Sequence, residues 1–148
     1  MKVLFDTSVL IAAMVEVHPS HDPAFDWLRK AKVEEIEGFV CSHTLAETYA
    51  VLTKLPISPK ISPNMAQRLI RDNLLSCTRV ITLTSKDYNS VIDSLTGLGV
   101  SGGVIYDALI VQAARKAKAD LILTLNIKDF KRVCPERSII IKAPLYWY

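Results

Sequence analysis

The stretch Met1-Lys2-Val3-Leu4-Phe5-Asp6-Thr7-Ser8-Val9-Leu10 decides the fold predicted for this chain. Its short apolar run, Val3-Leu4-Phe5, has the length of a buried strand and stops at a carboxylate. Two hydroxyl residues follow that can cap a helix, and the apolar residues 9–14 suit that helix. A strand that ends in Asp6 brings a negative charge to the carboxyl edge of a sheet, where open α/β proteins build their sites. Because burying an unpaired carboxylate is costly, we expect Asp6 to have a partner such as a metal ion.

Strand-like and helix-like segments alternate along the rest of the chain. Further strands are expected at residues 38–41, 80–83, 120–124 and 138–141. Helices are expected between them, at about residues 24–31, 42–55, 63–75, 85–95, 104–118 and 126–133. This alternation predicts an α/β fold, in which right-handed crossovers cover both faces of a parallel sheet of about four to five strands.

Two of these helices have predicted core faces, and one connection between helices is rich in proline. The helix after residue 23 is expected to bury Phe25 and Leu28, and the helix over 63–75 to bury Met65 with its apolar neighbours Leu69 and Ile70. The Leu55–Pro63 segment contains three prolines and is expected to be a surface connection.

The overall composition is that of a folded globular protein. The chain has 148 residues, of which 50% are hydrophobic and 22% charged, so we expect one domain over residues 1–148 and exclude disorder. A net charge of +3 permits a nucleic-acid partner without arguing for one. No apolar stretch has membrane-spanning length and no signal peptide is evident, so no membrane partner is expected. Three widely spaced cysteines are typical of reduced thiols in a cytoplasmic protein.

Four acidic residues are predicted to reach the same edge of the sheet. Asp6 ends the first strand, and Glu47 and Asp129 follow the starts of helices that come after strands. Asp107 lies in the first turn of a helix that runs back to the next strand, so its start lies at that edge as well. Each acid also has a local explanation. Asp6 and Asp129 could cap helices, Glu47 could close a capping box with Thr44, and Asp107 could interact with a helix dipole.

Four carboxylates at one edge would repel one another strongly unless a cation neutralised them. Hard oxygen ligands without cysteine or histidine suit Mg²⁺ or Mn²⁺ better than zinc. Such a site is equipped for metal-assisted hydrolysis of phosphodiester bonds.

The sequence around these acids resembles the PIN-domain ribonucleases and, within them, the VapC toxins of prokaryotic toxin–antitoxin pairs. Four stretches carry the resemblance in the order of the family, and together they cover almost the whole chain. They are Val3-Leu4-Phe5-Asp6-Thr7-Ser8, Ser42-His43-Thr44-Leu45-Ala46-Glu47, Tyr106-Asp107-Ala108-Leu109-Ile110 and Leu123-Thr124-Leu125-Asn126-Ile127-Lys128-Asp129-Phe130.

The resemblance implies a three-layer α/β/α sandwich and a Mg²⁺- or Mn²⁺-dependent endoribonuclease. In this reading Asp6, Glu47, Asp107 and Asp129 form the catalytic, metal-binding quartet. The polar residues Thr7, Ser8 and Asn126 would then orient water or the substrate phosphate. The implied partners are an RNA substrate, a small antitoxin that covers the acidic site, and a second copy of the chain in a homodimer.

Basic and histidine residues add weaker expectations. Lys128 and Lys131 follow closely on the fourth acid, and contact with RNA phosphates is as plausible for them as a solvated helix end. His18 and His21 are expected to be surface residues of a turn, because no third histidine or cysteine is spaced to complete a zinc set. His43 is expected to be structural or to lie near the rim of the site.

Other functional classes fit the sequence less well. Aspartyl-phosphate phosphatases have a second Asp two residues after the first, where this chain has Ser8, and response-regulator receivers end their third strand in Asp, where this chain has Leu83 and Thr84. The glycines at 97–103 lack the Gly-Lys-Ser/Thr of a phosphate-binding loop. Two alternatives remain open: a non-catalytic PIN scaffold that binds RNA or protein, and a housekeeping RNA-processing nuclease without an antitoxin.

Overall fold

Five strands form the centre of the protein. In the computed structural model, which describes residues 1–145, all of them pair in parallel in the order β3-β2-β1-β4-β5. Their bounds are β1 Lys2–Phe5, β2 Glu37–Cys41, β3 Arg79–Ile81, β4 Leu121–Leu123 and β5 Ile140–Lys142. The sequence prediction of a parallel sheet of four to five strands is confirmed. The aromatic tail at 146–148 lies outside the described residues.

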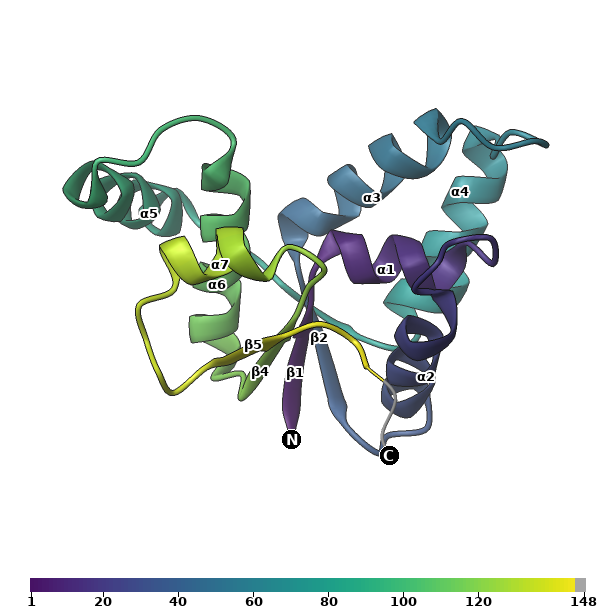
Figure 1. Cartoon of the computed structure of the whole chain (residues 1–148), viewed down its shortest axis with the longest axis horizontal. Helices are drawn as coiled ribbons and strands as arrows, with labels where there is room; N and C mark the ends of the chain where they lie inside the picture. The colour runs from purple at the N-terminus through teal and green to yellow at the C-terminus, as the bar shows by residue number, and fades with distance from the viewer. Residues whose placement is uncertain (146–148) are drawn as a thin grey trace.

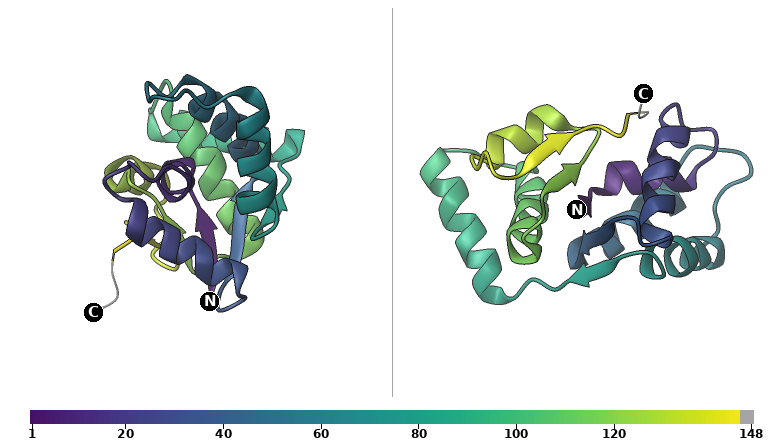
Figure 2. Two further views of the ribbon diagram at one scale, coloured as in Figure 1. Left: turned by 90° about the vertical axis from the view of Figure 1, so that its right-hand side faces the viewer. Right: turned by 90° about the horizontal axis from the view of Figure 1, so that it is seen from below.

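Helices connect the strands and cover both faces of the sheet. Their bounds are α1 Thr7–Met14, α2 His21–Lys32, α3 Ser42–Lys54, α4 Pro63–Leu69, the π-helix η1 Ile70–Leu75, α5 Ser85–Leu98, α6 Val104–Ala117 and α7 Ile127–Val133. Figure 1 shows α5, α6 and α7 on one side of the sheet and α1, α2 and α4 on the other. The view from below in Figure 2 shows the same division, so the predicted three-layer α/β/α sandwich is confirmed.

The layers follow from the alternation of side chains along the strands, because successive residues of a strand point to opposite faces. Leu4 of β1 and Ile122 of β4 belong to the buried cluster under α5, α6 and α7. Val3 and Phe5 belong to the cluster on the opposite face, under α1 and α2. A third, smaller cluster joins α1, α3 and α4 beside the sheet, and Leu52 and Ala66 are its fully buried members.

The predicted core face of the second helix was wrong at one residue. Phe25 is 49% exposed and stacks on the ring of His21 at a centroid distance of 5.6 Å, whereas Trp27 is only 1% exposed. The buried residues of α2 are Ala24, Trp27, Leu28 and Ala31, which repeat at the three- and four-residue spacing of one helix face. Phe25 falls one position away from that stripe.

The single helix predicted over 63–75 is divided. An α-helical part ends at Leu69, and the π-helical part η1 continues to Leu75. The wider winding brings Leu74 into the core, where it is fully buried, while Met65 on the predicted apolar side is 46% exposed. Asn73 donates from Nδ2 to the Leu69 carbonyl at 3.2 Å within the widened turn.

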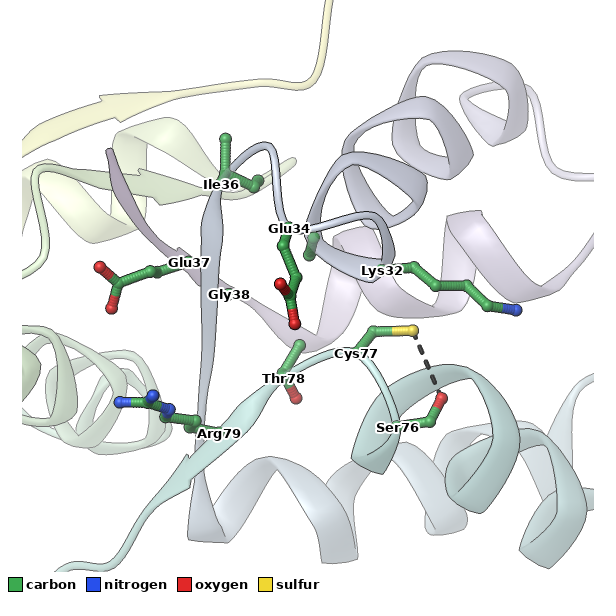
Figure 3. A pocket seen from close by; sticks show the side chains of 10 residues that line it. Lys32, Glu34, Ile36, Glu37, Gly38, Ser76, Cys77, Thr78 and Arg79 are labelled. Carbon is green, nitrogen blue, oxygen red and sulfur yellow. Dashed lines mark hydrogen bonds between the residues drawn. The ribbon is translucent and has the colours of Figure 1, made fainter.

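An open pocket of about 470 Å³ lies at the amino ends of β2 and β3, beside the end of α2; no prediction from the sequence concerned it. Figure 3 shows that its two cationic side chains, Lys32 and Arg79, extend away from it in opposite directions. Gly38 lies at its wall, and a Cβ there would come within 3.0 Å of the Ala31 side chain.

Within residues 1–145, no helix combines the length and the apolar character that a membrane crossing requires.

Candidate active site

Asp6 lies directly after β1, at the carboxyl end of the central strand, and is 3% exposed. Its Oδ2 atom accepts hydrogen bonds from the Ser8 hydroxyl at 2.6 Å and from the Thr124 hydroxyl at 2.8 Å. Although Asp6 occupies the N-cap position of α1, its side chain makes no cap hydrogen bond. The carboxylate is therefore held by hydroxyl groups at the end of the sheet, and the capping explanation of Asp6 is not supported.

The hydroxyl groups that hold Asp6 are themselves fixed by the loop that follows β4. Thr124 Oγ1 accepts from the Asn126 amide at 2.9 Å, and Ser8 Oγ accepts from the Leu125 amide at 3.0 Å. The Asp6 amide donates to the Leu123 carbonyl at 2.9 Å. This network joins the end of β1 to the end of β4 and fixes the orientation of the Asp6 carboxylate.

Thr124 is a site residue that the sequence reasoning missed. It is completely buried, and its hydroxyl connects the Asn126 amide to the Asp6 carboxylate. A signal was present in the sequence, because a polar residue directly follows the apolar run 121–123 as Asp6 follows its own strand. The register of the two strands, in which Phe5 pairs with Leu123, then places Thr124 beside Asp6.

Glu47 comes from α3, which begins at the carboxyl end of β2. The alternative of a capping box with Thr44 was wrong, because α3 begins at Ser42 and Thr44 already lies inside its first turn. Instead, Glu47 Oε2 lies 3.3 Å from His43 Nε2 without the geometry of a hydrogen bond. Glu47 Oε2 and Thr7 Oγ1 are both buried and have no hydrogen-bond partner. The site thus contains oxygen atoms whose capacity to bind is unused.

Asp107 and Asp129 complete the acidic group. Asp107 is half-buried in the first turn of α6, and Asp129 is exposed in the first turn of α7. Asn126 precedes α7 at its N-cap position, and its side chain makes no cap hydrogen bond. Figure 1 shows the starts of α1, α3 and α7 at the end of the sheet opposite the N-terminus of the chain.

The charges of the four acids act on one another. Burial raises the pKa of Asp107 to about 7, and the nearby charges of Asp6, Asp129 and Glu47 add to this effect. Burial also raises the pKa of Glu47, the charge of Asp6 raises it further, and His43 and Thr7 act in the opposite direction. The pKa of Asp6 is raised because its burial outweighs the hydrogen bonds that it accepts. The structure therefore brings all four predicted acids into one electrostatic group.

A cavity of about 240 Å³ lies within this group. Three of the acids line it, together with polar and apolar residues from α1, α3 and the loop after β4. The lining residues are Asp6, Thr7, Ser8, Ile11, His18, Glu47, Val51, Asp107, Leu125 and Asn126. His18 was predicted to be a surface residue of a turn, and it lies in the lining of this cavity. His21 does not line the cavity, and its Nδ1 atom lies 2.9 Å from the Ala12 carbonyl oxygen. Lys128 and Lys131 are exposed on α7.

The side chains fit a hard divalent cation by their chemistry. As they stand in residues 1–145, no three His, Cys, Asp or Glu side chains are close enough together to hold a metal ion. However, Mg²⁺ in proteins keeps several waters and commonly needs only one or two carboxylates plus substrate phosphate. The Glu47 Oε2 atom, which has no hydrogen bond, and the pKa values of Glu47 and Asp107, which burial and the neighbouring acids raise, are what a site for a cation would show without one.

The sequence matches known proteins over most of its length. Residues 3–135 match the PIN domain family model. Ribonuclease VapC27 of Mycobacterium tuberculosis is 34% identical over 116 residues, which are 78% of this chain and 79% of that protein. Ribonuclease VapC40 of the same species is 32% identical over 117 residues, which are 79% of this chain and 81% of that protein.

Solved structures share the fold. VapBC2 from Rickettsia felis, bound to a DNA fragment from its promoter, superposes with a TM-score of 0.68 at 24% identity, covering 97% of this chain and 98% of that chain. Mycobacterium tuberculosis VapC20, a toxin that cleaves the sarcin-ricin loop, superposes with a TM-score of 0.64 at 18% identity, covering 81% and 86% of the two chains. At these identities the likeness concerns the fold alone.

Proposed function

The chain belongs to the PIN-domain family and is related within it to the VapC ribonucleases, and we propose that it is a Mg²⁺- or Mn²⁺-dependent endoribonuclease. The observation that carries the proposal is the convergence of four carboxylates at one end of the sheet, where burial, together with the charges of the other three acids, raises the pKa of Asp107 to about 7. The names of the two relatives support RNA as the substrate.

Each residue of the site has a proposed role. Asp6, Glu47, Asp107 and Asp129 would hold the cation, which when bound supplies Lewis-acid stabilisation of the charge that develops at the scissile phosphate. Ser8 and Thr124 fix the orientation of Asp6 through their hydrogen bonds to Oδ2.

Three further positions complete the proposed site. The hydroxyl of Thr7 lines the cavity, is buried and has no hydrogen-bond partner. It would form a hydrogen bond with water or with the substrate phosphate. Asn126, in the cavity lining, would do the same from the loop after β4. The exposed Lys128 and Lys131 would contact phosphates that flank the cleavage site, which would make binding sensitive to salt.

We further propose that the protein is the toxin of a toxin–antitoxin pair. Solved structures of this fold include the VapBC2 complex and FitAB bound to an IR36 DNA fragment, which supports an antitoxin as partner. The antitoxin would cover the acidic cavity with a basic side chain, since a cation there offsets the repulsion among the acids. We propose a homodimer, one PIN domain over residues 1–148, and a cytoplasmic location, with which the three free cysteines agree.

Cleavage of labelled RNA tests the nuclease proposal. The wild type should cut in Mg²⁺ or Mn²⁺ and should stop cutting in EDTA. Asp107→Asn removes one charge and leaves the hydrogen bonds of Asp6 in place, and we expect it to cut at least about 100-fold more slowly, the scale for loss of one preorganised electrostatic group. The matched control is Asp93→Asn, an exposed carboxylate on α5 that should leave the rate unchanged.

The outcomes separate the functions. Cutting that persists in EDTA, or that Asp107→Asn retains at the wild-type rate, would refute the proposed metal-dependent site. Absence of cutting in every RNA pool would favour the non-catalytic scaffold. Growth arrest on expression, relieved by a small protein encoded next to this chain, would support the toxin over a housekeeping nuclease.

A further inference from the structure

Two aromatic side chains stack beside the acidic cavity. The rings of His43 and Tyr106 are nearly parallel, with a centroid distance of 5.0 Å and an angle of 6° between their planes. His43 lies in the first turn of α3 and Tyr106 in the first turn of α6, so the pair connects the two helices that carry Glu47 and Asp107. This geometry is that of a favourable stacked aromatic pair.

The pair is fixed on one side and open on the other. His43 Nε2 lies 3.3 Å from Glu47 Oε2, so the imidazole has a contact within α3 as well as its contact with the tyrosine ring. Tyr106 is 50% exposed, although one face of its ring lies against His43. A large aromatic ring is therefore supported on one face and exposed on the other, one residue before an acid of the site. Rigid presentation lowers the entropy that is lost when a ligand stacks on such a ring.

We propose that the stacked pair of His43 and Tyr106 is a platform on which a base of single-stranded RNA stacks next to the cleavage site. The inference rests on the proposed nuclease function and deepens it. Proteins that bind single-stranded RNA stack splayed bases on exposed aromatic side chains. Because the platform adjoins Asp107, a base stacked there fixes which phosphate of the strand reaches the four acids. Tyr106 is thus a substrate-positioning residue.

A purely structural role for the pair makes a different prediction. If the stack only joins α3 to α6, replacing Tyr106 changes stability and leaves the environment of a bound base unchanged. Binding therefore needs a readout that reports stacking directly. A 2-aminopurine base provides it, since its fluorescence is quenched when it stacks on an aromatic ring.

The experiment titrates a pool of single-stranded RNA octamers, each with one central 2-aminopurine, with the wild type and three variants in Ca²⁺ and in EDTA. Tyr106→Leu removes the ring but keeps an apolar side chain, and Tyr106→Phe keeps the ring. Tyr88→Leu is the matched control, because Tyr88 is 37% exposed on α5. Circular dichroism establishes that each variant is folded.

We expect saturable quenching by the wild type, Tyr106→Phe and Tyr88→Leu. Tyr106→Leu should bind about 5- to 150-fold more weakly, the range for loss of one stacked base, and should lose the quenching. Absence of quenching by the wild type, or equal quenching by Tyr106→Leu, would overturn the platform. Cleavage of the same octamers in Mg²⁺ is scored separately, so failure of the nuclease proposal is visible as uncut RNA whatever the fluorescence shows.

Discussion

Asp107→Asn should stabilise the metal-free protein at alkaline pH. The pKa of Asp107 is raised to about 7 by burial and by the charges of Asp6, Asp129 and Glu47. A carboxyl group whose pKa is higher in the folded state than in the unfolded chain opposes folding whenever it is ionised. Asparagine has nearly the same shape and no charge, so the substitution removes this opposition.

The magnitude follows from the shift. A rise from 3.8 to about 7 corresponds to roughly 4 kcal/mol at 1.36 kcal/mol for each pKa unit. Asp107 is only half-buried, and screening by solvent reduces the effect to about 1–2 kcal/mol. The unfavourable contribution of ionised Asp107 to folding is complete above pH 7 and shrinks as the pH falls. It vanishes below pH 3.8, where the carboxyl group is protonated in both the folded and the unfolded state.

Urea denaturation followed by circular dichroism, in EDTA and low salt, measures this effect. At pH 8 the free energy of unfolding of Asp107→Asn should exceed that of the wild type by about 1–2 kcal/mol, and the difference should decline towards pH 4. The control Asp93→Asn, on an exposed site, should stay within about 0.5 kcal/mol of the wild type. Equal stability of Asp107→Asn and wild type at pH 8 would refute the reasoning that burial and the neighbouring acids raise the pKa of Asp107.

Three further substitutions test separate parts of the structure. Thr124→Val should lower the free energy of unfolding by about 1–3 kcal/mol in urea, because it removes the buried hydrogen bond to Asp6; an unchanged value would show that this bond does not stabilise the fold. Gly38→Ala should cost about 1–3 kcal/mol in the same assay, because its Cβ would meet side-chain carbons at 3.0 and 3.1 Å, and a variant as stable as wild type would contradict this tight packing. Asp87→Asn should lower the melting temperature at pH 7. Lys116 and the capping box of α5 hold the pKa of Asp87 below its usual value of 3.8, so the difference from wild type should shrink as the pH falls below 3.8; a constant difference would contradict this origin.

The elements that the sequence predicted best are those with strong local signals. The apolar run before Asp6 is a central strand, and the helix predicted over 104–118 is α6, Val104–Ala117. The convergence of the acids was predictable as well, because parallel strands bring their carboxyl ends to one edge whatever their order in the sheet.

What the sequence did not predict depends on contacts between distant segments. The buried role of Thr124 depends on the pairing of β1 with β4, which joins residues 118 positions apart. The stacking of His43 on Tyr106 depends on two helix starts meeting beside the sheet. The exposure of Phe25 depends on the exact rotation of α2, and a shift of one position along a helix turns the predicted face away from the core.

Binding of Mn²⁺ tests most directly whether the four acids form one cation site. Titration of the metal-free protein, followed by the electron paramagnetic resonance signal of free Mn²⁺, measures stoichiometry and affinity. We predict one or two saturable sites in the wild type that Mg²⁺ displaces, with binding weakened at least about 10-fold in Asp107→Asn and unchanged in Asp93→Asn. Binding that Asp107→Asn leaves unchanged, or no saturable binding by the wild type, would contradict a cation site at this end of the sheet.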